Sequence, residues 1–166
     1  MSYRIEVPER AHELSGIDAY DYADAFAVDE VVTPTPRQWF EEFFGPRTHL
    51  VPLVKLVHGR ILGMRLDGPP ESYGWRVERE TESVAVLAAE GRLMTARIAA
   101  YSTTDRAVFA TFVRFDHWAT RAIWAVISIA HRNLAGIIVD QAARRPRAVR
   151  PRQPDGDPDV QNIHHG

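Results

Sequence analysis

The sequence predicts an α+β domain in which a curved antiparallel sheet of at least five strands wraps around one long C-terminal helix. The first observation is that residues 111–145 join a β-type run directly to a long segment with an apolar stripe. The second is a series of short, alternating segments upstream, and the third is a pair of short helical stretches before most of them. This order is typical of a helix-grip fold, which traps a cavity between sheet and helix. The alternative is a lipocalin-like barrel, which needs more strands and no long helix crossing the sheet.

Composition and charge narrow the classes of function. The 166 residues are enough for one domain with a sizeable core. A formal net charge of -2 gives no reason to expect nucleic acid as a partner. The absence of cysteine excludes disulfides, thiolate metal sites and a cysteine nucleophile, and it fits a reducing cytoplasm. The N-terminal segment MSYRIEVPERAHEL lacks the apolar core of a secretion signal. We therefore expect a cytoplasmic protein.

The first half of the chain predicts one strand and two helices. Residues 1–17 form a polar lead-in without clear periodicity. Residues 18–28 alternate and predict the first strand, with one face made of Tyr20, Tyr22, Asp24, Phe26 and Val28. A capping box opens a short aromatic helix at 36–44, and a second, less regular helix covers about 48–62.

The second half predicts four more strands and the closing helix. A loop rich in Gly and Pro at 63–72 precedes strands over 73–80, 83–89, 93–102 and 107–115, with a hairpin turn at 90–92. Asp116 is expected to cap a helix over 118–143, whose apolar stripe consists of Ile123, Val126, Ile127, Ala130, Leu134, Ile137 and Ile138. Its polar middle, His131–Asn133, argues against a membrane span. The basic and acidic tail at 144–166 is expected to be disordered.

Three segments resemble a known group of proteins. They are DYADAF at 21–26, LVKLVHGRILGMR at 53–65, and TFVRFDHW at 111–118 together with AHR at 130–132. These segments resemble an uncharacterised bacterial family of the START and Bet v 1-like superfamily, which includes polyketide cyclases and lipid carriers. The resemblance covers residues 18–143 and implies a helix-grip domain with a pocket. Where that family has an acidic-aromatic-basic triplet this chain has Thr95-Ala96-Arg97, and Thr120 and Trp124 also depart from the pattern. The resemblance therefore implies a pocket and no particular reaction.

His131, Asp24 and Tyr22 are the candidate catalytic residues. His131 lies at the edge of the apolar stripe beside Trp124 and could act as a general acid or base near neutral pH. The alternative is a histidine that ties the helix to the sheet by one hydrogen bond. Asp24 and Tyr22 share the inward face, where a carboxylate must be paired or used. Arg97 is the obvious partner for the Asp24 carboxylate, so the alternative interpretation is a structural ion pair between these two residues.

The predicted strands three to five contain many alanines, so their side chains are unusually small. The positions are Ala85, Ala88, Ala89, Ala96, Ala99, Ala100, Ala107 and Ala110. Alanine is a poor strand residue, so we expect either a cavity or close packing against the helix at 36–44. The sequence leaves open which face of strand 93–102 lines such a cavity. The expected ligand-binding residues are Trp75, Phe109, Thr111, Trp124 and Arg97.

These observations predict binding of a hydrophobic, polyketide- or lipid-like small molecule in an internal cavity. The protein is expected to act as a cofactor-independent cyclase, dehydratase or isomerase, or alternatively as a non-catalytic carrier or sensor of an apolar metabolite. The histidines show no metal-ligand spacing, and no phosphate-binding glycine loop is present. We therefore expect no metal, no nucleotide cofactor and no nucleic-acid partner. The oligomeric state is left open, with a homodimer among the possibilities.

Overall fold

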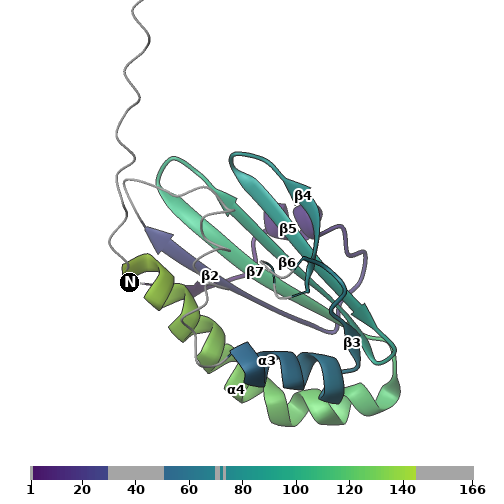
Figure 1. The fold of residues 1–166 in the computed structure, drawn as a ribbon. Coiled ribbons are helices and arrows are strands. Elements are labelled where there is room, and N and C mark those ends of the chain that lie inside the picture. The colour runs from purple at the N-terminus through teal and green to yellow at the C-terminus, as the bar shows by residue number, and fades with distance from the viewer. Residues whose placement is uncertain (1, 30–50, 70–71, 73, 145–166) are drawn as a thin grey trace, which may run out of the picture.

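The computed structural model describes residues 2–29, 51–69, 72 and 74–144, and these form an α+β domain (Figure 1). Its described strands make one seven-stranded antiparallel sheet in the order β1-β2-β7-β6-β5-β3, with β4 also paired to β5. The strands are β1 (Ser2–Ile5), β2 (Tyr22–Asp29), β3 (Met64–Arg65), β4 (Arg76–Glu80), β5 (Val84–Gly91), β6 (Met94–Ser102) and β7 (Arg106–Phe115). The described helices are α1 (Glu9–Ser15), α3 (Val51–Leu56), the π-helical turn η1 (Val57–Ile61) and α4 (Trp118–Arg144).

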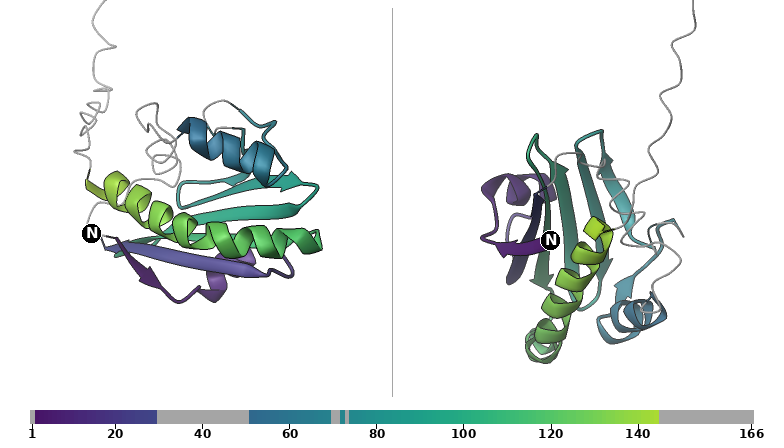
Figure 2. Two further views of the ribbon diagram at one scale, coloured as in Figure 1. Left: turned by 90° about the horizontal axis from the view of Figure 1, so that it is seen from below. Right: turned by 90° about the vertical axis from the view of Figure 1, so that its left-hand side faces the viewer.

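The sheet is covered on both faces. Helix α4 lies along one face, together with α3 and η1, whereas α1 lies on the other (Figure 2). Alternation along β2 places Phe26 and Val28 in the core beneath α4, and Ala25 and Ala27 in the core beneath α1. This confirms the predicted antiparallel sheet and C-terminal helix, and the arrangement is consistent with the helix-grip prediction.

The first 17 residues, expected to be a lead-in, contain two elements of the domain. β1 pairs with β2, so that Ser2 lies opposite Val28. In α1, Ala11 and Ser15 lie one turn apart and are buried, and Gly16 ends the helix at a φ of 63°. β1 spans only two periods of a strand pattern and α1 spans fewer than two turns of a helix, which is too short for a periodicity to stand out in the sequence.

Other boundaries differ from the prediction in informative ways. β2 begins at Tyr22, four residues later than expected, and β3 forms within the expected loop at 63–72. Asp116 does not cap α4, because its carboxylate accepts hydrogen bonds from Thr95 Oγ1 and Arg114 Nε. The capping acceptor is His117 Nδ1, 3.2 Å from the backbone nitrogen of Ala119. The expected helix at 36–44 and the tail beyond Arg144 lie outside the described residues.

The face of α4 that meets the sheet is rotated from the predicted stripe. Among the α4 residues whose burial is described, Thr120, Trp124 and Val139 are buried, and partly buried Ile123, Ile127 and Ala135 pack on the same core. Val126, Ala130 and Ile137 of the predicted stripe are instead exposed. A helix with apolar residues on most of its circumference does not reveal from sequence which side is buried. No helix within the described ranges has the length and apolarity needed to cross a membrane.

Alanine substitutions at two glycines test the packing of α4 and β5. A Cβ at Gly136 would lie 3.4 Å from Phe26 Cε1, an ordinary contact. We expect Gly136→Ala to raise the free energy of unfolding by about 0.5–1 kcal/mol, because alanine is the better helix former.

The matched control is Gly91→Ala, whose Cβ would clash with the carbonyl oxygen of Gly63 and lie 2.7 Å from Met64 Cα. This variant should lose about 1–3 kcal/mol. Urea unfolding of both variants measures the two changes. A loss of stability in Gly136→Ala would contradict the described approach of α4 to β2.

Candidate functional site

A carboxylate lies on β2 of the sheet, beneath α4. Asp24, the third residue of β2, is 1% exposed and faces the helix. Tyr22 precedes it by two residues on the same face, and its hydroxyl donates a hydrogen bond of 2.7 Å to Asp24 Oδ2. Strand alternation therefore accounts for the orientation of both side chains, as the sequence predicted.

Two aromatic side chains from α4 complete the site. Trp124 and His131 are about two turns apart and lie on the same side of the helix. Their ring centroids are 5.2 Å apart, and the Tyr22 ring lies 5.0 Å from Trp124 and 6.1 Å from His131. We call Tyr22, Asp24, Trp124 and His131 the buried polar cluster.

Three polar atoms of this cluster are buried without a hydrogen-bond partner among the described residues. They are Asp24 Oδ1, Trp124 Nε1 and His131 Nε2. Most buried polar atoms in proteins are hydrogen-bonded, and leaving one unpaired costs about 1–3 kcal/mol. Three such atoms within one group of touching side chains form the most unusual feature of the described chain.

Burial controls the protonation of the cluster. Desolvation lowers the pKa of His131, and the nearby Asp24 carboxylate offsets part of that effect. Desolvation, together with the hydrogen bond to Asp24, raises the pKa of Tyr22 well above its usual range. Near neutral pH the cluster thus holds a protonated phenol, a neutral imidazole and an indole N–H donor. A neutral imidazole can accept a proton, and the imidazolium that forms can then return it, so the group can support acid–base chemistry.

The register of the sheet sets the surface next to the cluster. On the α4 face, Asp24 lies beside Thr111, which lies beside Ile98, which lies beside Leu87. On either side of this row of paired residues, the neighbouring pairs of β5 and β6 on the same face consist of small side chains. These pairs are Ala85 with Ala100 and Ala89 with Ala96. All four alanines are buried. An apolar surface made of Ile98, Leu87 and the four alanines therefore extends from the cluster across β6 and β5.

The structure brings together five of the predicted site residues. Tyr22, Asp24, Trp124 and His131 form the cluster, and Thr111 lies beside Asp24 on β7. Phe109 lies one row away, opposite Phe26. Trp75 does not belong to this group: it is buried next to β4, across the sheet from β2, with its ring 5.9 Å from that of His58.

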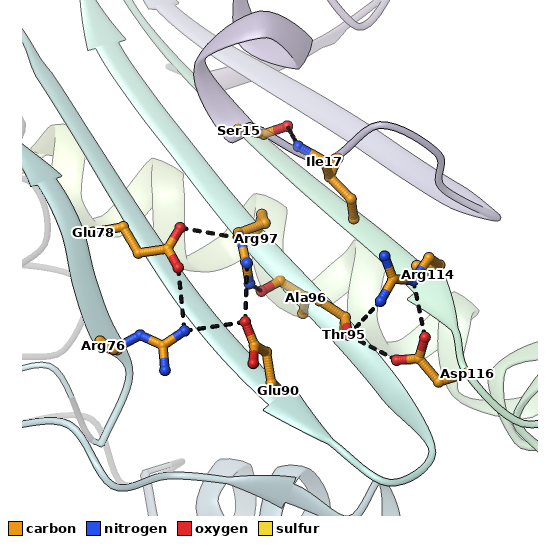
Figure 3. Close-up of polar contacts among 10 residues, drawn as sticks. All are labelled: Ser15, Ile17, Arg76, Glu78, Glu90, Thr95, Ala96, Arg97, Arg114 and Asp116. Atoms are coloured by element: carbon orange, nitrogen blue, oxygen red, sulfur yellow. Dashed lines mark hydrogen bonds and ion pairs between the residues drawn. The ribbon is translucent and has the colours of Figure 1, made fainter.

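Arg97 lies on the opposite face of the sheet, and the expected ion pair with Asp24 does not form. Its guanidinium contacts Glu78 Oε2 at 3.2 Å and Glu90 Oε1 at 3.0 Å, in a network with Arg76 (Figure 3). Met94, Ala96, Ile98 and Ala100 of β6 face α4, so the odd-numbered residues must face the other way. The even-numbered face of β6 therefore lies beneath α4.

A pocket that no sequence pattern predicted lies at the start of α4. This pocket of about 350 Å³ is lined by Asp21, Phe115, Asp116, His117, Trp118 and Arg121. Asp21 Oδ2 accepts a hydrogen bond from the backbone of Phe115, and Asp21 Oδ1 pairs with Arg121. Its charges are thus already paired, unlike those of the cluster. Within the described ranges, no three His, Asp or Glu side chains gather as metal ligands.

Comparison with protein-family models, curated proteins and solved structures produced no match to this chain. The resemblance to the START and Bet v 1-like superfamily therefore stays a prediction. Any functional conclusion must be drawn from the geometry of the site.

The lowered pKa of His131 predicts a specific dependence of stability on pH. Above its ordinary pKa of 6.5 the imidazole is neutral in both the folded and the unfolded chain. As the pH falls below that value, the unfolded chain takes up a proton that the buried imidazole resists, so the folded state loses stability. The loss should reach at most about 1.4 kcal/mol per pH unit.

Chemical unfolding between pH 5 and pH 8, roughly the range in which histidine titrates, measures this loss. We expect His131→Gln to lack the His131 contribution, so that the difference between the two stability curves is constant above the ordinary pKa and changes below it, with only the wild-type protein showing the His131-dependent loss. Parallel curves would show that His131 is protonated as readily in the folded state as in the unfolded chain.

Proposed function

We propose that the protein binds a small, largely apolar organic molecule between α4 and the sheet, with the polar group of that molecule held by the buried polar cluster. The observation that carries this proposal is the set of three unpaired buried atoms, Asp24 Oδ1, Trp124 Nε1 and His131 Nε2. A ligand with one hydrogen-bond donor and one acceptor would satisfy the carboxylate and the indole together. Such a group is present in hydroxy-ketones, enols and carboxylic acids.

The surroundings of the cluster suit the apolar part of such a molecule. Ile98 and Leu87 continue the row that starts at Asp24, and alanines flank them on both sides. Binding sites for small molecules typically combine a mostly apolar lining with a few converging polar groups. A polyketide- or lipid-like chain matches this combination, and the helix-grip resemblance points to the same class of ligand.

In the catalytic form of the proposal, His131 moves a proton. The neutral imidazole would accept a proton from the bound substrate at Nε2, while Trp124 Nε1 donates a hydrogen bond to the oxygen on which charge develops. Tyr22 stays protonated and holds Asp24 in place. This chemistry suits a cofactor-independent cyclase, dehydratase or isomerase, in which the shape of the site also contributes by orienting the substrate.

Carriage or sensing without reaction is the second candidate. It is favoured by the apolar residues that surround the cluster, because a carrier needs only a polar anchor and a matching apolar surface. The two candidates share one binding site and differ in whether His131 has to change its protonation state.

Native mass spectrometry of the full chain tests the proposal. We expect protein purified without detergent, then incubated with a panel of hydroxylated aromatic ketones and fatty acids, to retain one molecule per chain. His131→Gln and Asp24→Asn should each weaken retention about tenfold or more, because Asn offers the ligand a neutral acceptor in place of a charged one and Gln has no ring nitrogen at the position of Nε2.

The matched control is His12→Gln. His12 is a partly buried histidine on α1, whose Nε2 already contacts the carbonyl oxygen of Ile17 at 2.8 Å, and α1 packs on the other face of the sheet. Equal loss of ligand in this control, or unchanged retention in all three variants, would contradict the proposed site. A turnover that falls in His131→Gln by much more than the retention does would favour the enzyme, whereas weakened retention with no turnover of any ligand in the panel would favour the carrier.

A further inference from the structure

The outward side of α4 carries an apolar surface that no other described element of the chain covers. Between Trp118 and Ile137 the described exposed positions are Trp118, Arg121, Ala122, Ala125, Val126, Ile129, Ala130, Asn133 and Ile137. Arg121 is the only charged residue among them. Trp118 is 83% exposed, Val126 79%, Ile129 61% and Ile137 51%.

These residues form one continuous stripe. At 100° per residue, all of them except Arg121 fall within an arc of about 140°, and the stripe runs for roughly 30 Å along the helix. We call this set of eight residues, without Arg121, the outer stripe. Trp124 and His131 lie on the opposite, sheet-facing side. A helix that is apolar on both sides is typical of one that is covered on both sides.

We propose that the outer stripe pairs with the outer stripe of a second copy, the two helices running antiparallel about a twofold axis. The stripe is a near-palindrome about a centre between Ile127 and Ser128. Antiparallel packing at that centre places Val126 opposite Ile129 of the other copy, and Ala125 opposite Ala130. Further out, it places Ala122 opposite Asn133 and Trp118 opposite Ile137. Every member of the stripe thereby meets another member, as a twofold interface requires.

Side-chain size and charge both suit this pairing. Ala122 lies near the midline of the stripe, and Ala125 and Ala130 lie at its two edges, so small side chains flank Val126 and Ile129 at the centre. The larger Trp118 and Ile137 meet at the two ends of the contact. The stripe contains no charge that would face its own copy. Arg121 lies at its edge, where Asp21 Oδ1 holds its guanidinium at 3.2 Å.

The exposed apolar area of the outer stripe is comparable to the area that each partner buries in a stable dimer. The four large side chains expose on the order of 500 Å² per copy, compared with about 800 Å² per partner in a standard interface. The alanines and Asn133 add to this sum. Because the cluster lies on the other side of α4, the pairing does not depend on the proposed ligand.

Sedimentation velocity on the full chain measures the assembly. We expect the wild-type protein to sediment at twice the chain mass of 18.8 kDa. Ile129→Glu should raise the dissociation constant of the dimer at least about 100-fold, because it buries a charge against Val126 of the other copy. The control is Val77→Glu, an equally apolar-to-acidic change at a 40% exposed position on β4, which should leave the dimer intact.

Circular dichroism shows whether each variant is folded, and Ala130→Glu replaces Ile129→Glu if that variant is not. Co-sedimentation with vesicles of phosphatidylethanolamine and phosphatidylglycerol tests the stripe against a lipid surface. A monomer at all concentrations, a dimer that survives both acidic substitutions, or a monomer that binds vesicles through the stripe would each overturn the proposal.

The orientation can be tested directly because the chain has no cysteine. Ala122→Cys and Asn133→Cys proteins are prepared separately, mixed, and oxidised. Antiparallel pairing predicts a disulfide between the two kinds of chain in the mixture and none in either protein alone, since equivalent residues are then about 16 Å apart along the axis. Cross-linking of Ala122→Cys with itself would indicate parallel helices and overturn the twofold arrangement.

Discussion

The packing of α4 across β1, β2 and β7 is the constraint on which the rest of this structure depends. It removes one face of β2 from water, while on the other face, where α1 packs over β6 and β7, Ala25 and Ala27 are buried in a second core. A strand covered in this way would ordinarily be apolar throughout. Asp24 breaks that pattern in the middle of β2, and Trp124 and His131 of α4 bring two further polar atoms to the same point. Among the described residues, only one of the two Asp24 oxygens has a hydrogen-bond partner, the Tyr22 hydroxyl.

Unpaired polar atoms at this position destabilise the folded state unless a bound molecule forms hydrogen bonds with them. An unpaired buried carboxylate oxygen and two unpaired ring nitrogens together oppose folding by several kcal/mol, on the order of a third of a typical domain's stability. The close packing around Phe112 and the alanines of β2, β6 and β7 offsets that cost elsewhere. Natural proteins concentrate such departures from good packing at functional sites. A bound ligand that pairs with these atoms would remove this cost, and the neutral imidazole would supply one of the pairing groups.

Much of the fold was predictable because its longer elements carry clear patterns. Alternation identified the inward face of β2, including Tyr22 and Asp24, and it located β5, β6 and β7 to within a few residues. The short β1, α1 and β3 carried too little pattern to be recognised. The side of the sheet on which Arg97 lies could not be predicted, because both faces of β6 are largely apolar and only the pairing register decides between them. For the same reason the buried side of α4 was misassigned: Val126 and Ile137 are as apolar as the residues that meet the sheet.

The central claim is that the unpaired atoms of the cluster are ligand contacts. A high-resolution crystal structure of protein purified gently from its native cells tests it most directly. The account predicts electron density for an organic molecule within hydrogen-bond distance of Asp24 Oδ1 and at least one of Trp124 Nε1 and His131 Nε2, with its apolar part over Ile98 and its neighbouring alanines. Density showing these three atoms bonded only to one another or to ordered water, above a fully packed Ala85–Ala100 and Ala89–Ala96 surface, would contradict it.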